Sequence, residues 1–121
     1  MTRQELIGLC LTFPDAYEDY PFDEIADDNA CTVMRHKKNK KSFALIMRHG
    51  GALYLNLKCD PLEADFLRGV YKSVIPGYHM NKTHWNTVIM CGDVPDDEIK
   101  RMVEHSYELI KPKVRKPKCA D

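Results

Sequence analysis

The sequence predicts an α+β fold, in which an antiparallel β-sheet of about four strands or more packs against helices at the N- and C-terminal ends. Three observations carry this prediction. Apolar residues recur at helical spacing near both ends of the chain. Its middle contains runs in which residues alternate between two faces, as in strands, and tight-turn sequences separate these runs. With 121 residues, 44% of them hydrophobic and 30% charged, the chain is long enough to bury the core of one domain.

The first helix begins near the N-terminus. Thr2 and Glu5 have the spacing of a capping box, in which each side chain satisfies a backbone N–H of the other. Pro14 ends the helical pattern. The acidic segment that follows, residues 14–30, leaves room for a short edge strand. The expected buried stripe is Leu6, Leu9, Cys10 and Phe13, widened by Ile7 and Leu11.

Strands are predicted over residues 31–37, 42–48 and 52–58, and from about residue 84 to 91. The turns between the first three contain Lys38-Asn39-Lys40 and His49-Gly50-Gly51, so these strands form an antiparallel meander. The middle strand is apolar on both faces, with Phe43, Leu45 and Met47 opposite Ala44 and Ile46. This pattern predicts an inner strand that is covered on both sides.

Two further helices are predicted. Asp60, Pro61 and Glu63 have the features of a helix start, with a capping aspartate followed by proline at the first helical position. The last helix begins near Pro95 and ends at Lys111-Pro112. We expect residues 1–111 to form a single domain and residues 112–121 a basic flexible tail. The expected buried stripes are Leu62, Phe66, Leu67, Val70 and Tyr71 in the first of these helices, and Ile99, Met102, Val103, Tyr107 and Ile110 in the second.

Five cysteines, an odd number without a CxxC pair, favour reduced thiols, and the N-terminal sequence resembles a helix start rather than a signal peptide. No apolar run approaches the roughly 20 residues that cross a bilayer. We therefore expect a cytoplasmic monomer without a membrane partner. His79 and His84 with Cys59 or Cys91 lack the spacing of a zinc site, so no metal or cofactor is predicted.

The segment from Pro76 to Val88 is unusually rich in large polar side chains and contains the single tryptophan. Two interpretations remain open. In the first the segment is architectural, with Trp85 packed in the core and Asn81 in a left-handed turn. In the second it lines a polar pocket of a small-ligand or protein-binding domain. The residues of that candidate site are Tyr78, His79, Asn81, Lys82, His84, Trp85 and Asn86.

The formal net charge is zero, but the charges are segregated along the chain. Seven carboxylates fall within residues 15–28, and five basic residues fall within residues 35–41. A hairpin tip that carries several lysines resembles a wing whose ammonium groups replace the counterions of DNA phosphates. The other interpretation is a solubilising turn whose lysines protect a sheet edge. The candidate DNA-binding residues are Arg35, Lys37, Lys38, Lys40 and Lys41, with Lys82 extending the positive surface.

The sequence identifies no catalytic residue. His105 and Ser106 are neighbours, but adjacent side chains on a helix point apart and cannot form a nucleophile–base pair. No glycine-rich phosphate loop or dinucleotide fingerprint is present.

Several motifs together resemble the YjbR/MmcQ family of small bacterial proteins. They are Leu57-Lys58-Cys59-Asp60-Pro61, Pro76-Gly77-Tyr78-His79-Met80-Asn81-Lys82, His84-Trp85-Asn86-Thr87-Val88 and His105-Ser106-Tyr107, with Tyr20-Pro21-Phe22 and Phe43-Ala44. The resemblance covers nearly the whole chain. It implies a fold like that of the CyaY/frataxin group and a DNA-binding protein with a double-wing arrangement, and it brings no catalytic residue. The resulting hypothesis is a non-catalytic DNA-binding module with little sequence preference. The alternative is the small-ligand or protein-binding domain described above.

Overall fold

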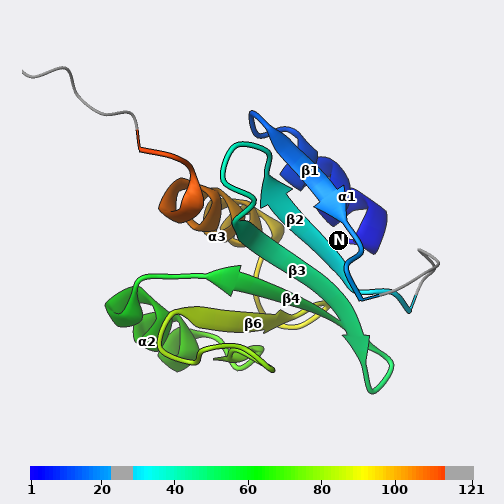
Figure 1. The fold of residues 1–121 in the computed structure, drawn as a ribbon. Coiled ribbons are helices and arrows are strands. Elements are labelled where there is room, and N and C mark those ends of the chain that lie inside the picture. The colour runs from blue at the N-terminus through cyan, green and yellow to red at the C-terminus, as the bar shows by residue number, and fades with distance from the viewer. Residues whose placement is uncertain (23–28, 114–121) are drawn as a thin grey trace, which may run out of the picture.

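Within residues 1–22 and 29–113, which the computed structural model describes, six strands form one antiparallel sheet and three helices pack against it (Figure 1). The strand order is β1-β2-β3-β4-β6-β5, so β6 lies between β4 and β5. The elements are α1 (Arg3–Leu11), β1 (Ala16–Asp19), β2 (Thr32–His36), β3 (Ser42–His49), β4 (Ala52–Lys58), α2 (Pro61–Val70), β5 (Val74–Pro76), β6 (Trp85–Ile89) and α3 (Asp96–Ile110).

The α+β prediction is confirmed, and all four predicted strands are present as β2, β3, β4 and β6. The edge strand for which the acidic segment left room is β1, which pairs with β2. Strand β5 was not predicted, because its three residues are too few to show an alternating pattern. The predicted tail falls mostly on residues 114–121, outside the described part of the chain.

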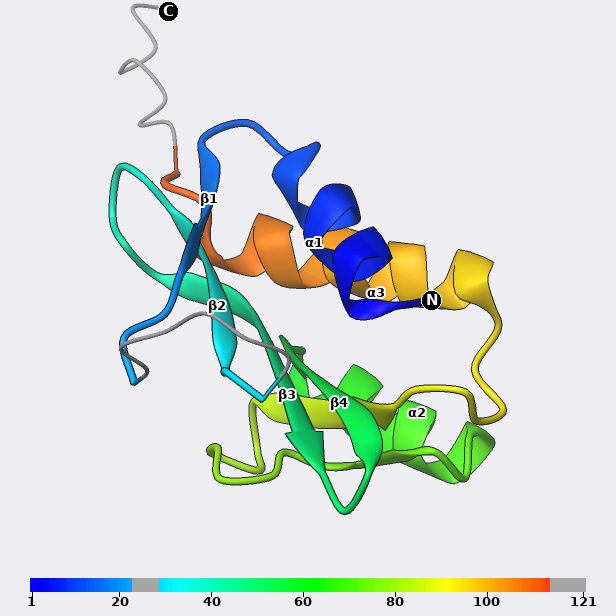
Figure 2. The same cartoon turned by 90° about the vertical axis from the view of Figure 1, so that its right-hand side faces the viewer.

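Helices α1 and α3 cover the same face of the sheet, as Figure 2 shows. Side chains of both helices join Leu53, Leu55 and Leu57 of β4 in the main hydrophobic core. A second, smaller cluster on the opposite face contains Val33, Leu45 and Trp85. The sheet is therefore buried on both sides at its centre, which explains the apolar pattern of β3.

A β-bulge corrects the predicted orientation of Phe43. The register places Met34 opposite Ala44 and Arg35 opposite Ser42, so Phe43 is an extra residue in β3. A bulge lets two successive residues face the same side of a sheet. Phe43 accordingly packs in the main core together with Ala44, whereas Leu45 faces the smaller cluster.

The two terminal helices follow their predicted patterns closely. The capping box of Thr2 and Glu5 is formed at the start of α1. The stripe expected of α3 is buried throughout, and Ser106 is buried with it. In α1, Leu6, Ile7 and Cys10 are buried, but Leu11 is 43% exposed, because it lies at the end of the helix and turns away from the core.

The buried face of helix α2 differs from the predicted one. Leu62, Phe66 and Val70 were expected to be buried, but they are 89%, 66% and 50% exposed. Polar contacts orient the helix instead. Glu63 pairs with Arg101 of α3 at 2.7 Å, and Arg68 donates from Nε to Asn86 Oδ1 of β6 at 2.6 Å. These contacts place Ala64 and Leu67 on the buried side of the helix.

The predicted start of α2 is confirmed in one respect and corrected in another. Pro61 occupies the first helical position, and Asp60 is the N-cap residue. However, the Asp60 side chain makes no capping hydrogen bond. Its Oδ2 lies 3.8 Å from His105 Nε2 of α3 instead.

Two phenylalanines provide a matched test of this fold. Phe43 is fully buried and Phe66 is 66% exposed. Phe43→Ala should lower the free energy of unfolding by about 3–5 kcal/mol, because it leaves a cavity in the main core. Phe66→Ala should change it by about 0.5 kcal/mol or less. Equilibrium urea denaturation of both variants checks this, and equal losses would contradict the described orientation of α2.

Candidate functional site

The turn between β2 and β3 carries four exposed lysines, Lys37, Lys38, Lys40 and Lys41. Its backbone is closely held. Lys40 N–H donates to His36 O at 2.7 Å, and Lys40 adopts a positive φ of 58°. Lys41 N–H donates to Asn39 Oδ1 at 3.0 Å. The ammonium groups therefore extend from a rigid turn, which we call the basic hairpin (residues 37–41).

Asn39 joins the basic hairpin to the C-terminal end of α3. Its Nδ2 donates to Ile110 O at 2.7 Å, and so satisfies one of the carbonyls left without a partner at a helix end. His36 stacks on Tyr107 of the same helix with ring centroids 5.9 Å apart. Lys113, which follows α3 three residues after Ile110, is exposed.

Three predicted DNA-binding residues make contacts within the protein. Arg35 pairs with Asp19 at 2.9 Å and donates to Lys40 O at 3.0 Å, so it supports the hairpin from below. Lys38 Nζ lies 3.9 Å from Asp15. Lys82 Nζ donates to Gly77 O at 2.9 Å. Lys37, Lys40 and Lys41 therefore remain as the main outward-facing charges of the predicted set.

The segment from Pro76 to Val88 is partly architectural. Trp85 is only 9% exposed and packs on Val33 and Leu45. Gly77 approaches it so closely that an added Cβ would lie 2.8 Å from Trp85 Cβ. The left-handed residue of the loop is His79, with φ of 60°, rather than Asn81. Asn81 instead accepts a hydrogen bond from Thr83 N–H through Oδ1 at 2.9 Å, because that short side chain can close a turn on its own backbone.

Tyr78 and His79 form an aromatic cluster with two residues that the sequence analysis did not select. The Tyr78 ring centroid lies 4.6 Å from that of His49, 5.7 Å from that of Tyr54 and 4.1 Å from that of His79. The two histidines are exposed and the two tyrosines are half-buried. The aromatic cluster arises because β3, β4 and the loop after β5 meet at one place, which spacing along the chain does not reveal.

The other candidate ligand-binding residues are not gathered around these rings. Asn86 is fully buried. It faces the helices, where it contacts Arg68 and donates from Nδ2 to Ala64 O at 3.2 Å. Trp85 faces the opposite side of the sheet, since successive residues of a strand alternate. His84 is exposed at the end of the loop. These residues therefore lie on two faces of the sheet and do not form the single polar pocket that was expected.

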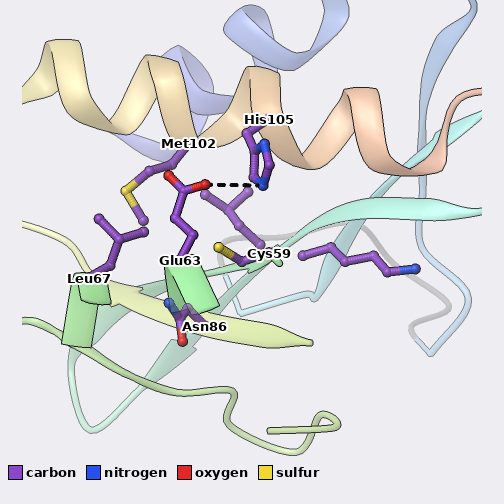
Figure 3. A pocket seen from close by; sticks show the side chains of 8 residues that line it. Cys59, Glu63, Leu67, Asn86, Met102 and His105 are labelled. Atoms are coloured by element: carbon purple, nitrogen blue, oxygen red, sulfur yellow. Dashed lines mark ion pairs between the residues drawn. The ribbon is translucent and has the colours of Figure 1, made fainter. Parts of the chain in front are cut away.

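Between α2 and α3 lies a polar cluster that the sequence analysis also missed (Figure 3). Cys59, Glu63 and His105 bring their sulfur, oxygen and nitrogen atoms within 4.8 Å of one another. His105 Nε2 is 3.4 Å from Glu63 Oε2. Burial raises the pKa of the Cys59 thiol to about 11, and the nearby carboxylates of Glu63 and Asp60 add to this effect. Cys59 was considered only with His79 or His84, and the structure pairs it with another histidine.

The remaining described cysteines form no comparable site. Cys10 is buried, Cys31 is partly buried and Cys91 is exposed. Residues 1–22 and 29–113 include no helix with the length and apolar character that a membrane span requires.

Comparison with known proteins agrees with this architecture. The family model described as YjbR matches residues 11–109. The Bacillus subtilis protein YyaQ is 36% identical, over 92% of this chain and 99% of its own length. The Escherichia coli K12 protein YjbR is 32% identical, over 89% of this chain and 86% of its own length.

Solved structures show the same fold. A crystal structure of a Pseudomonas syringae protein superimposes with a TM-score of 0.79 at 31% identity, covering 92% of this chain and all of the other. The Deinococcus radiodurans protein DR2400 gives a TM-score of 0.78 at 34% identity, covering 90% and 78%.

The fold thus defines a small α+β domain with bacterial relatives, in which three helices pack on an antiparallel sheet. The chain belongs to the YjbR family. The names of the relatives described above state no activity, so function has to be argued from the geometry of this chain.

Proposed function

We propose that this protein is a non-catalytic DNA-binding module that docks the basic hairpin onto the phosphates of duplex DNA. The observation that carries the proposal is the hydrogen bond from Asn39 to Ile110 O at 2.7 Å, which fixes the exposed lysines beside the end of α3. A rigid turn keeps several positive charges together, so less conformational entropy is lost on binding than with a flexible tail.

The chemistry of the hairpin favours phosphates over bases. Lysine ammonium groups act as point charges, whereas sequence is read mainly by planar side chains that form paired hydrogen bonds with base edges. The one arginine of the hairpin region, Arg35, is held by Asp19 and by Lys40 O. We therefore expect little sequence preference, as the sequence analysis proposed, and binding in a bacterial cytoplasm where duplex DNA is accessible.

Nearby carboxylates limit the number of contacts. Asp15 lies beside Lys38 and Asp19 beside Arg35, so this part of the acidic segment adjoins the hairpin instead of facing away from it. Lys37, Lys40 and Lys41 are then the main phosphate ligands. Each neutralised phosphate contributes about 0.9 to the slope of log affinity against log salt concentration, so three contacts give a slope of roughly −3.

Titration of a fluorescently labelled duplex at several salt concentrations tests the proposal. The wild-type protein should bind with an affinity of about 10⁻⁴–10⁻⁶ M near physiological salt, and the affinity should fall with the slope given above. Replacing Lys37, Lys40 and Lys41 by glutamate should abolish binding, because it reverses the charge of the whole docking surface.

A charge-matched control distinguishes binding through the basic hairpin from general electrostatic attraction between the protein and DNA. Arg48, Lys72 and Lys100 are exposed and lie away from the hairpin, and replacing all three by glutamate changes the net charge by the same amount. This variant should keep most of its affinity. The proposal is wrong if the wild type shows no salt-dependent binding at tens of micromolar, or if both triple variants lose binding equally.

The aromatic cluster of His49, Tyr54, Tyr78 and His79 favours a second candidate function, the binding of a small planar ligand. Tilted and edge-on ring contacts leave ring faces on which another flat molecule can stack. The tyrosine hydroxyls and imidazole nitrogens provide hydrogen bonds at its edge. This candidate retains Tyr78 and His79 from the predicted pocket and replaces the other members with His49 and Tyr54.

Nuclear magnetic resonance can test the second candidate directly. Nucleosides and aromatic carboxylates added to ¹⁵N-labelled protein should shift the amide signals of the aromatic cluster. Tyr78→Ala should remove these shifts, and Tyr17→Ala, on the distant strand β1, should preserve them. Shifts that survive Tyr78→Ala, or no shifts at millimolar ligand, would exclude this candidate.

A further inference from the structure

The polar cluster between α2 and α3 combines three donor atoms of different chemistry. Cys59 follows β4, Glu63 lies in the first turn of α2, and His105 lies in α3. Figure 3 shows the three side chains converging, with a dashed line marking the pair of Glu63 and His105. We propose that Cys59, Glu63 and His105 bind a divalent transition-metal ion. Thiolate, imidazole and carboxylate together suit Zn²⁺ best.

The donor spacing fits a tetrahedral ion. His105 Nε2 and Glu63 Oε2 are 3.4 Å apart. Two such ligands with bonds of about 2.0–2.1 Å to zinc lie about 3.3 Å apart at the tetrahedral angle. A zinc-bound sulfur would lie about 3.6 Å from each of them. The three atoms already fall within 4.8 Å of one another, so a side-chain rotation completes the geometry without backbone movement.

A second, independent observation concerns His105. Its Nε2 is buried and has no hydrogen-bond partner among the described residues. The distance of 3.4 Å to Glu63 exceeds the roughly 2.7–2.9 Å of a charge-assisted hydrogen bond. A buried polar atom without a partner is destabilising, and an ion at this position would relieve that cost.

Neighbouring contacts hold all three donors in place. Ser106, adjacent to His105, accepts a hydrogen bond from Lys58 N–H, adjacent to Cys59, at 2.9 Å. Cys59 N–H donates to His84 O at 2.8 Å. Arg101 binds Glu63 through Oε1 at 2.7 Å, which leaves Oε2 directed at His105. Such outer contacts orient metal ligands and reduce the entropy lost on binding.

The available space selects an ion over an organic ligand. The hollow at this cluster has room for about one water-sized group. Leu67 and Met102 form its apolar wall. The charges of Arg101 and Arg68 oppose the ion, whereas the carboxylates of Glu63 and Asp60 and the deprotonated sulfur of Cys59 attract it.

Metal binding also releases a proton. The Cys59 thiol loses its proton to the solvent, and the sulfur forms a bond to the ion in its place. Protons therefore compete with the metal for this sulfur. The affinity should therefore rise with pH, by up to about tenfold for each pH unit.

Cobalt(II) provides a spectroscopic probe. Addition of Co²⁺ to the reduced protein should give a thiolate-to-cobalt absorption band that saturates at one ion per chain, and Zn²⁺ should displace it. Cys59→Ala should abolish the band. Glu63→Gln, which retains the shape of the side chain, and His105→Gln should each weaken Zn²⁺ binding by at least about tenfold.

Variants outside the cluster serve as controls. Cys91→Ala and His84→Gln change an exposed thiol and an exposed imidazole outside the cluster, and they should leave the band and the affinity unchanged. Circular dichroism of each variant confirms folding, and Glu63→Gln serves as the test if the Cys59 variant does not fold. The absence of the band in the wild type, or its persistence in Cys59→Ala, overturns the proposal. This result is independent of DNA binding.

Discussion

The buried hydroxyl of Ser106 is the contact on which the arrangement of the molecule depends. It donates to Phe43 O at 2.5 Å and accepts from Lys58 N–H at 2.9 Å, so one side chain of α3 joins β3 and β4. Phe43 is the bulged residue, whose backbone groups depart from the regular ladder. The hydroxyl thus provides hydrogen-bond partners for Phe43 O and for Lys58 N–H, and it fixes the position of α3 along the strands.

Both proposed sites follow from that position. One turn beyond Ser106, Ile110 receives the side chain of Asn39, and this contact holds the basic hairpin against the end of the helix. One residue before Ser106, His105 meets Cys59 and Glu63. A helix displaced by one turn, about 5.4 Å, would separate both sets of residues. The position of α3 therefore links the fold to its candidate functions.

Patterns that repeat over many residues were predicted well from the sequence. Helix α3 has fifteen residues, and its apolar stripe determines which side is buried. Helix α2 has ten residues, and there the apolar stripe misleads, because ion pairs and amide contacts of Glu63 and Arg68 orient it. The bulge at Phe43 was equally invisible, since it appears only in the pairing of two strands.

The candidate sites also differ in whether the sequence alone reveals them. The hairpin lysines all lie within five residues of the chain, so their grouping was evident from the sequence. The aromatic cluster and the trio of Cys59, Glu63 and His105 are assembled from separate elements, and no spacing rule connects them. Trp85 was assigned two interpretations, and its burial favours the architectural one.

Equilibrium unfolding of Ser106→Ala tests the central role of this hydroxyl most directly. The substitution leaves the buried Phe43 C=O and Lys58 N–H without a partner, and each such group typically costs about 1–3 kcal/mol. We expect a loss of about 2–4 kcal/mol in the free energy of unfolding, together with faster hydrogen exchange at the Lys58 amide. A loss below about 0.5 kcal/mol, the range of surface substitutions, with unchanged exchange would contradict the account.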